Sequence, residues 1–231
     1  MIRTIIFDID ETLYIYTPLH RITLKILDDY CVEHLGFEPG EFAAAWPRVY
    51  KEITAELGFG NSCIHDILLR SQIILEQKGI NPLPHARTLY YLYWDNIISR
   101  MVPCDGIHQF LQKARQSGIR LGLGTDMMTE IQYRKLEKLE LLDAFDFIVT
   151  SEEAGYEKPQ EGFFRKVLEK TKCDVEECVM IGDNWDKDIV GAFGVGMPAI
   201  WFRPDVDPES CDSEHRKILV RSYEELTRKL L

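Results

Sequence analysis

The segment that most constrains this chain is a short apolar run, 5–7, that ends at two aspartates, Asp8 and Asp10. Residues i and i+2 of a β-strand point to the same side, so we expect both carboxylates to face one small site where the strand ends. Two carboxylates held that close repel each other, and both stay ionised only beside a cation. The segment therefore predicts a metal site or a proton-sharing pair, unless it is an ordinary acidic strand end at the surface.

The composition argues against several classes of binding protein. The chain has 231 residues, which suits one large or two small domains with a buried core. Its formal net charge of -11 argues against affinity for nucleic acid or for an anionic membrane, because both favour a basic surface. A small anionic substrate remains compatible, since a bound divalent cation can reverse the local charge. We therefore expect a small-molecule partner and no nucleic acid.

The sequence carries no pattern of a membrane or secretory segment. It lacks an apolar run of about 18 residues, and it begins without a basic region and long apolar stretch typical of a signal peptide. The six cysteines form no pair with zinc-site spacing, and Cys173 and Cys178 are the closest two. We expect a cytoplasmic protein with reduced cysteines and no contact with a membrane.

Residues 16–99 have the pattern of a block of helices. Thr17-Pro18 is a favourable helix start, because proline is tolerated in the first turn, and Gly36 marks an end. Between them, apolar residues recur at helical spacing at Leu19, Ile22, Ile26, Leu27, Tyr30 and Cys31. Further helices are expected over 41–57, 63–78 and 84–101. We predict a helical domain, residues 16–99, inserted behind the first strand.

The remainder of the chain alternates between strands and helices. We expect strands over 120–124, 145–150, 178–181 and 198–202, and helices over 107–116, 129–139, 161–171, 187–193 and 222–231. The proline- and acid-rich stretch 203–215 is expected to be a loop. Such alternation is typical of a parallel sheet covered on both faces. We therefore predict an α/β fold, with a Rossmann-like, doubly wound sheet formed by residues 1–15 and 100–231.

Polar residues stand at the predicted carboxyl ends of the strands, where open parallel sheets bind ligands. The first strand leads to Asp8 and Asp10, and the second ends at Thr125 and Asp126. A hydroxyl followed by the backbone N–H groups of a helix start can bind an anion. Thr125 taken alone, however, is more typical of a plain helix N-cap.

The third and fourth strand ends add a lysine and further carboxylates. Lys158 precedes Pro159, which restricts the backbone of the lysine, and the fourth strand leads to Gly182-Asp183 and then Asp188. Each of these turns alone could be solvated surface. Together they combine carboxylates that suit Mg²⁺, a cation that suits a phosphate, and a carboxylate that could attack phosphorus.

These motifs resemble those of the haloacid dehalogenase-like hydrolase superfamily over essentially the whole chain. In order they are Asp8-Ile9-Asp10-Glu11-Thr12, Thr125, Lys158-Pro159, and Gly182-Asp183 with Asp188. The helical block resembles the family's helical cap of the first type. The first motif with its Leu-Tyr continuation, together with Thr125-Asp126-Met127 and Ile131-Gln132, resembles the phosphatase- and nucleotidase-rich branch. The resemblance implies a Mg²⁺-dependent phosphatase that acts on a small phosphomonoester, either a nucleotide or a sugar phosphate.

The resemblance also implies roles for the acids. Asp8 would be the nucleophile that forms an aspartyl-phosphate, and Asp10 the general acid and base. Mg²⁺ would be held by Asp8, by the backbone carbonyl of Asp10 and by Asp183. Asp188 would orient Lys158 or a water molecule at the metal.

The same resemblance assigns the phosphate ligands. Thr125 and Lys158 would bind the phosphoryl oxygens. Asp126 would also lie at the substrate, although the family often has Asn there. A carboxylate facing the phosphate would repel it, so we expect Asp126 to face the helix N-terminus instead.

Several alternatives stay open. A phosphoglucomutase-like phosphotransferase shares this machinery, and a non-catalytic regulatory protein could keep the fold. Asp10 argues against a metal-free dehalogenase, and no motif supports the cap lysine of a phosphonatase. Residues that could contact the leaving group are Tyr14, Tyr16, His20 and Arg70. The sequence does not distinguish a monomer from a homodimer.

Overall fold

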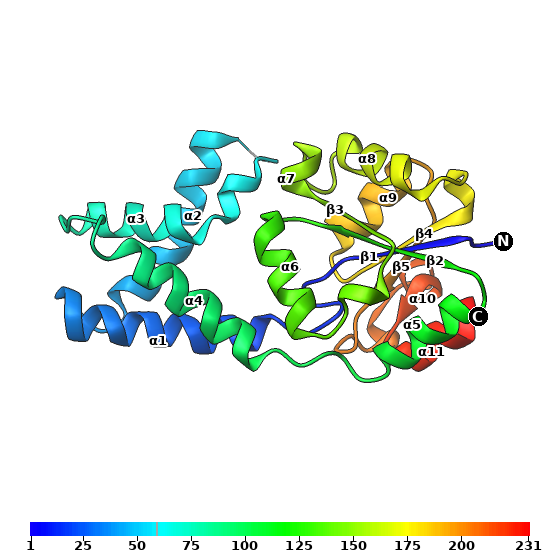
Figure 1. Cartoon of the computed structure of the whole chain (residues 1–231), viewed down its shortest axis with the longest axis horizontal. Helices are drawn as coiled ribbons and strands as arrows, with labels where there is room; N and C mark the ends of the chain where they lie inside the picture. Colours follow the sequence, from blue (N-terminus) through cyan, green and yellow to red (C-terminus); the bar gives the residue numbers. More distant parts are fainter. Residues whose placement is uncertain (59) are drawn as a thin grey trace. The chain divides into compact units, whose positions relative to one another are not determined.

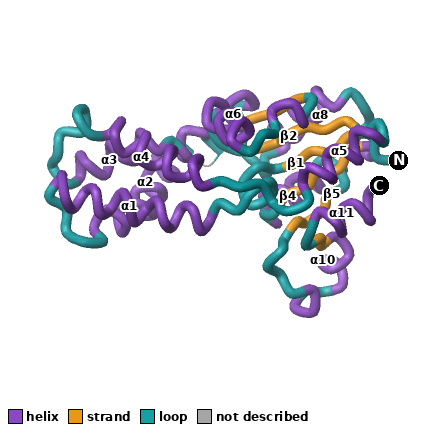
Figure 2. The backbone as a smooth tube through the Cα atoms, turned by 60° about the horizontal axis from the view of Figure 1, so that its bottom comes forward, coloured by secondary structure: helices purple, strands orange, loops and turns teal. Residues whose placement is uncertain are grey.

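The chain divides into two compact units. The computed structural model describes residues 1–58 and 60–231. One unit comprises Met1–Ile15 with Val102–Leu231, and the other comprises Tyr16–Met101. The strands belong to the first unit, and the described part of the second is built of helices and loops (Figure 2).

The first unit is built on a parallel sheet. Within its described residues, six strands follow the order β3-β2-β1-β4-β5-β6. They are β1 (Thr4–Phe7), β2 (Arg120–Thr125), β3 (Phe147–Thr150), β4 (Cys178–Gly182), β5 (Ala199–Phe202) and β6 (Leu219–Val220). Neighbouring strands are parallel throughout. The chain winds outward from β1 first through β2 and β3 and then through β4, β5 and β6, which confirms the predicted doubly wound α/β fold.

Helices cover both faces of this sheet (Figure 1). Helices α8 (Glu161–Thr171) and α9 (Val190–Gly194) lie on one face, and α5 (Ile107–Gln116) and α11 (Tyr223–Leu230) lie on the other. Because side chains alternate along a strand, Ile6 packs with Phe163 and Val167 of α8, whereas the Phe7 ring contacts Phe110 of α5 at 5.9 Å between centroids. This two-sided packing explains why every residue of β1 is buried. The unit's other helices are α6 (Thr129–Lys138), α7 (Ser151–Ala154) and α10 (Ser213–Ile218).

The second unit has its own apolar interior. Its helices are α1 (Thr17–Leu35), α2 (Glu41–Leu57), α3 (Ile67–Gln77) and α4 (Ala86–Arg100). Helix α1 ends as predicted at Gly36, which has the left-handed φ of 69° that glycine adopts without strain. Leu27, Trp46, Leu75 and Trp94 are buried, one from each helix. Among the described residues, no helix has the length and apolar character needed to span a membrane.

Three local predictions were wrong. The helix expected over 63–78 is broken at Asp66, whose carboxylate accepts the Leu68 N–H at 2.8 Å and begins α3. The helix expected over 187–193 is a π-helical turn, Trp185–Ile189, followed by α9. The expected loop 203–215 contains a 3₁₀ turn, Pro208–Ser210, and the start of α10, and β6 follows.

Packing between β2 and β3 leaves no space for a side chain at Gly122. A Cβ atom there would lie 2.1 Å from Cζ of the Phe147 ring, which belongs to the neighbouring strand. We expect Gly122→Ala to lower the free energy of unfolding of this unit by about 1–3 kcal/mol, because the half-buried Phe147 ring must leave its packed position to accept the methyl group. Chemical denaturation followed by circular dichroism measures the change.

Gly194→Ala is the matched control for this substitution. Its Cβ would meet nothing within 4 Å, and Gly194 is exposed at the end of α9. We expect this variant to unfold within about 1 kcal/mol of the parent. Equal unfolding midpoints for the two variants would contradict the packing described for Gly122.

Candidate active site

The register of the central strands brings their carboxyl ends together. Phe7, the last residue of β1, is aligned with Leu123 of β2 and with Ile181 of β4. The Asp8 N–H continues this pairing and donates to the Ile181 carbonyl at 2.9 Å. Asp8 follows β1 and Asp183 follows β4, so the two residues leave the sheet from adjacent strands. They lie at the edge formed by the carboxyl ends of the strands, where open parallel sheets bind ligands.

One buried lysine joins two carboxylates at this edge. The Lys158 Nζ atom lies 2.7 Å from Oδ1 of Asp8 and 2.6 Å from Oδ1 of Asp188. All three side chains are almost completely excluded from solvent. Burial alone would lower the pKa of Lys158, but the charges of Asp188 and Asp8 raise it well above its ordinary value, so the ammonium stays charged. The structure thus holds the predicted nucleophile against a permanent cation.

Asp188 has room beside β4 because the strand ends in glycine. A Cβ atom on Gly182 would lie 2.3 Å from Oδ2 of Asp188. The same oxygen accepts the Asn184 N–H at 2.9 Å. The π-helical turn and Gly182 together direct Asp188 toward Lys158.

Asp183 completes a cluster of three carboxylates with Asp8 and Asp188. Oxygen atoms of these residues lie within 4.8 Å of one another. In the described ranges, Asp183 has no ion-pair partner of its own. Burial, and then repulsion by Asp8 and Asp188, raises the pKa of Asp183 to about 8. Burial likewise raises the pKa of Asp8 to about 7, against the opposing effect of Lys158. An oxygen-only cluster with more negative charge than one ammonium can balance fits a hard divalent cation such as Mg²⁺.

Thr125 lies at the end of β2 and its hydroxyl is already engaged. The Gln132 side-chain amide donates to Thr125 Oγ1 at 2.7 Å, and this hydroxyl lies 3.2 Å from the Asp126 carbonyl, to which it donates. The alternative that Thr125 is a plain helix N-cap is wrong, because α6 begins only at Thr129. Gln132 was not predicted as a site residue, and its side chain fixes the direction of this hydroxyl.

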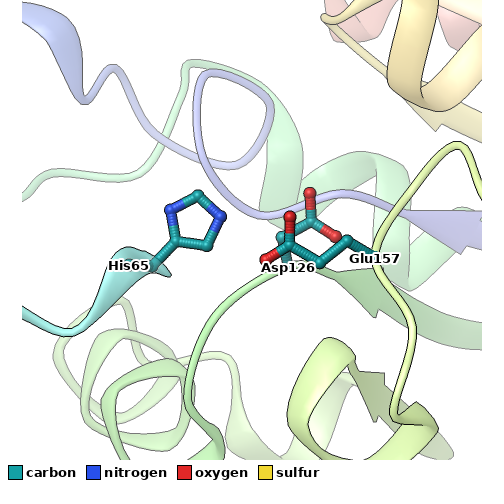
Figure 3. Close-up of side chains that lie close together, drawn as sticks. All are labelled: His65, Asp126 and Glu157. Carbon is teal, nitrogen blue, oxygen red and sulfur yellow. The ribbon is translucent and has the colours of Figure 1, made fainter. Parts of the chain in front are cut away.

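The predicted direction of Asp126 was also wrong. Its carboxylate does not bind the start of α6; Oδ1 accepts the Lys158 backbone N–H at 3.0 Å, and Oδ2 accepts Lys187 Nζ at 2.7 Å. Burial would raise the pKa of Asp126, but Lys158 and Lys187 lower it. Figure 3 shows Asp126 beside Glu157, and Lys187 also lies 3.8 Å from that buried glutamate. These contacts hold the loop that carries Lys158.

Asp10 is bound by a lysine that the sequence reasoning missed. The Lys135 Nζ atom donates to Oδ1 and Oδ2 of Asp10 at 2.7 and 2.9 Å, and the Tyr14 hydroxyl also donates to Oδ1. A signal for this lysine was present, since it occupies the apolar stripe of α6 between the buried residues Ile131 and Leu139.

Three of the residues proposed to contact a leaving group belong to the helical unit. There, the Tyr93 hydroxyl binds both the Tyr16 hydroxyl and, at 2.8 Å, His20 Nδ1. Arg70 is buried and stacks on the rings of Trp46 and Tyr50 at 4.9 and 4.8 Å. Tyr16 and His20 are half-buried, and the contacts of all three residues within this unit do not by themselves indicate a ligand.

Comparisons with known proteins identify a matching family and several relatives. The sequence pattern of the haloacid dehalogenase-like hydrolases matches residues 2–196. The chain is 31% identical over 219 residues to ribulose-1,5-bisphosphate 5-phosphatase of Halopiger xanaduensis, covering 94% of this chain and 91% of that protein. It is 31% identical over 204 residues to glyceraldehyde 3-phosphate phosphatase of Pyrococcus abyssi, covering 88% and 82%. The fold resembles the magnesium-bound HAD hydrolase YfnB of Bacillus subtilis, with a TM-score of 0.73, 21% identity and coverage of 99% and 98%.

The raised pKa of Asp183 makes stability depend on pH when no metal is bound. The folded protein retains a proton on Asp183 up to about pH 8, whereas an ordinary aspartate releases it near 3.8. The stabilisation from this group is therefore complete below pH 3.8 and is lost as the pH rises through about 8. We expect the Tm of the EDTA-treated protein to fall between about pH 5 and pH 8, and to fall less steeply in Asp183→Asn.

Addition of Mg²⁺ at about pH 8 supplies the complementary measurement. It should raise the Tm of the wild type more than that of Asp183→Asn, because a ligand stabilises the state that binds it. If the Tm of the two proteins depends on pH in the same way and responds equally to Mg²⁺, the raised pKa does not belong to Asp183.

Proposed function

Because this chain belongs to the haloacid dehalogenase-like hydrolase family, we propose that it is a phosphatase that hydrolyses a small phosphomonoester through a phosphorylated Asp8. The observation that carries the proposal is the buried Asp8 carboxylate, held 2.7 Å from Lys158 in a cluster with Asp183 and Asp188. Such a carboxylate has a fixed direction and a neighbouring cation for the charge of the incoming phosphoryl group.

The reaction would take place in two displacements. In the first, a carboxylate oxygen of Asp8 bonds to phosphorus while the bond from phosphorus to the leaving oxygen breaks, and Asp10 gives that oxygen a proton. In the second, water attacks phosphorus, Asp10 takes the proton, and the bond from phosphorus to Asp8 breaks. Asp10 thus returns to its starting state and one phosphate is released.

Residues for a metal and for the phosphate are available at the same edge. We infer that Asp8, Asp183 and the backbone carbonyl of Asp10 hold Mg²⁺, which neutralises phosphoryl charge when bound. Asp188 orients Lys158, which it contacts at 2.6 Å. Lys158 binds phosphoryl oxygens, as does Thr125 once its hydroxyl turns away from the Asp126 carbonyl, and Asp126 contributes by holding the Lys158 backbone.

The named relatives favour a phosphorylated sugar as the substrate. Proteins 31% identical to this chain act on ribulose 1,5-bisphosphate and on glyceraldehyde 3-phosphate. We propose a sugar phosphate of that size, with residues 16–99 acting as a cap that selects the leaving group. The six free cysteines are in accord with a reducing compartment such as the cytoplasm. A monomer or a homodimer would serve this chemistry equally well.

Replacement of the nucleophile tests the reaction. We expect Asp8→Asn to lower kcat at least about 10³-fold while the fold survives, because the amide is a poor nucleophile and keeps the shape of the side chain. Asp186→Asn is the matched control, an exposed aspartate in the turn that contains Asp188, and it should retain wild-type activity. Phosphate release and circular dichroism on both variants provide the readout. Wild-type turnover in Asp8→Asn would exclude the proposed nucleophile.

A panel of about one hundred phosphorylated metabolites tests the metal and the substrate together, because the leaving group is selected outside the shared phosphoryl site. We expect release that requires Mg²⁺, is abolished by EDTA, and is concentrated on sugar phosphates. Release that persists in EDTA would contradict the metal assignment. Release concentrated on nucleotides would leave the reaction intact but refute the proposed substrate class.

A further inference from the structure

Lys135 is a buried cation whose charge is directed at Asp10. Its side chain is 0% exposed, and its ammonium donates to both carboxylate oxygens of Asp10, which lies 125 positions earlier in the chain. A charged lysine is rarely buried to this extent without a partner that offsets the loss of hydration. Leucine or methionine would pack better in the apolar stripe of α6. The ion pair with Asp10 is therefore what explains a lysine at this position.

The turn that carries Asp10 is held on several sides. The Leu13 N–H donates to the Ile9 carbonyl at 2.9 Å, and the Tyr223 hydroxyl donates to the Thr12 carbonyl at 2.9 Å. The Cys104 N–H donates to the Leu13 carbonyl at 2.8 Å. With the backbone held in this way, the remaining freedom at Asp10 is rotation of its side chain.

We propose that Lys135 is a positioning residue that, with Tyr14, holds the Asp10 carboxyl group in the orientation needed for proton transfer to the leaving oxygen. This inference rests on the role proposed for Asp10 above. In this role Lys135 acts on the reaction only through Asp10.

The two oxygens of Asp10 are held unequally. Within the residues that the structure describes, Oδ1 accepts hydrogen bonds from both Tyr14 and Lys135, whereas Oδ2 accepts one, from Lys135. Each carboxylate oxygen has two lone pairs. Both lone pairs of Oδ1 are therefore occupied, whereas one lone pair of Oδ2 remains available. The structure assigns Oδ2 as the oxygen that exchanges a proton with the substrate, while Oδ1 serves as the anchor.

The test compares substrates that differ in their need for a proton. A sugar phosphate releases a poor leaving group that must be protonated, whereas p-nitrophenyl phosphate releases a stable phenolate that needs little help. The ratio of their kcat/KM values reports this step, because kcat/KM measures stabilisation of the transition state relative to the free enzyme and substrate. A general structural defect would lower both values alike.

We expect Lys135→Met to lower kcat/KM about 100-fold for the best sugar phosphate and less than about 5-fold for p-nitrophenyl phosphate, because general acid catalysis contributes about 10²–10⁴-fold. Asp10→Asn should show the same split. Lys138→Met, on the exposed side of α6, is the matched control and should leave both values unchanged. Tyr14→Phe removes the other donor to Oδ1 and should give a smaller split in the same direction, which keeps the test decisive if Lys135→Met does not fold.

Two outcomes would overturn the proposal at different levels. If Asp10→Asn shows the split while Lys135→Met and Tyr14→Phe lower both substrates equally or not at all, Lys135 is not a positioning residue and the role of Asp10 stands. If Asp10→Asn itself shows no split, the proton-transfer role proposed for Asp10 fails and the inference about Lys135 fails with it.

Discussion

The ion pairs that Lys158 makes with Asp8 and Asp188 are the contact on which the rest of the site depends. Three charged groups lie together out of solvent, an arrangement that is tolerable only because each ammonium–carboxylate contact is short and well directed. Removing the lysine would leave two buried carboxylates beside Asp183 without the cation that contacts both of them. Many surrounding features follow from this demand: Gly182 makes room for Asp188, Asp126 holds the backbone of Lys158, and Lys187 balances Asp126.

The parallel sheet makes such a cluster possible from residues that are far apart in sequence. β1 lies between β2 and β4, so the loops that follow these three strands open at the same edge. Asp8, the proposed nucleophile, is placed by a fully buried strand, whose direction is set by apolar packing on both faces. Asp10, the proposed acid–base group, lies two residues further on, in a turn tied to α11 through Tyr223. Rigidity at the first group and controlled orientation at the second are what a two-step displacement requires.

The sequence predicted β1 to β5, most helices and the polar residues that follow the strands, because apolar periodicity and turn residues are local signals. It did not reveal Lys135, Gln132 or Lys187, because charged and polar residues on helices are ordinarily assigned to the solvent side. Their burial is decided by partners far along the chain: Lys135 meets Asp10 across 125 positions, and Lys187 meets Asp126 across 61. The two-residue strand β6 was missed because pairing with β5, not its own composition, creates it. The direction predicted for the Asp126 side chain was wrong because the prediction considered only the nearby helix start. The groups that bind this carboxylate belong to Lys158 and Lys187, which are distant in sequence.

The central claim is that Asp8 becomes phosphorylated. It is tested most directly by mixing enzyme, Mg²⁺ and substrate, quenching with acid within the first turnover, and locating phosphate in the digested protein by mass spectrometry. The account predicts one phosphoryl group on the peptide that contains Asp8, formed and lost at rates that support turnover, and none in Asp8→Asn. Turnover without phosphorylated peptide, or with phosphate on another residue, would contradict the account.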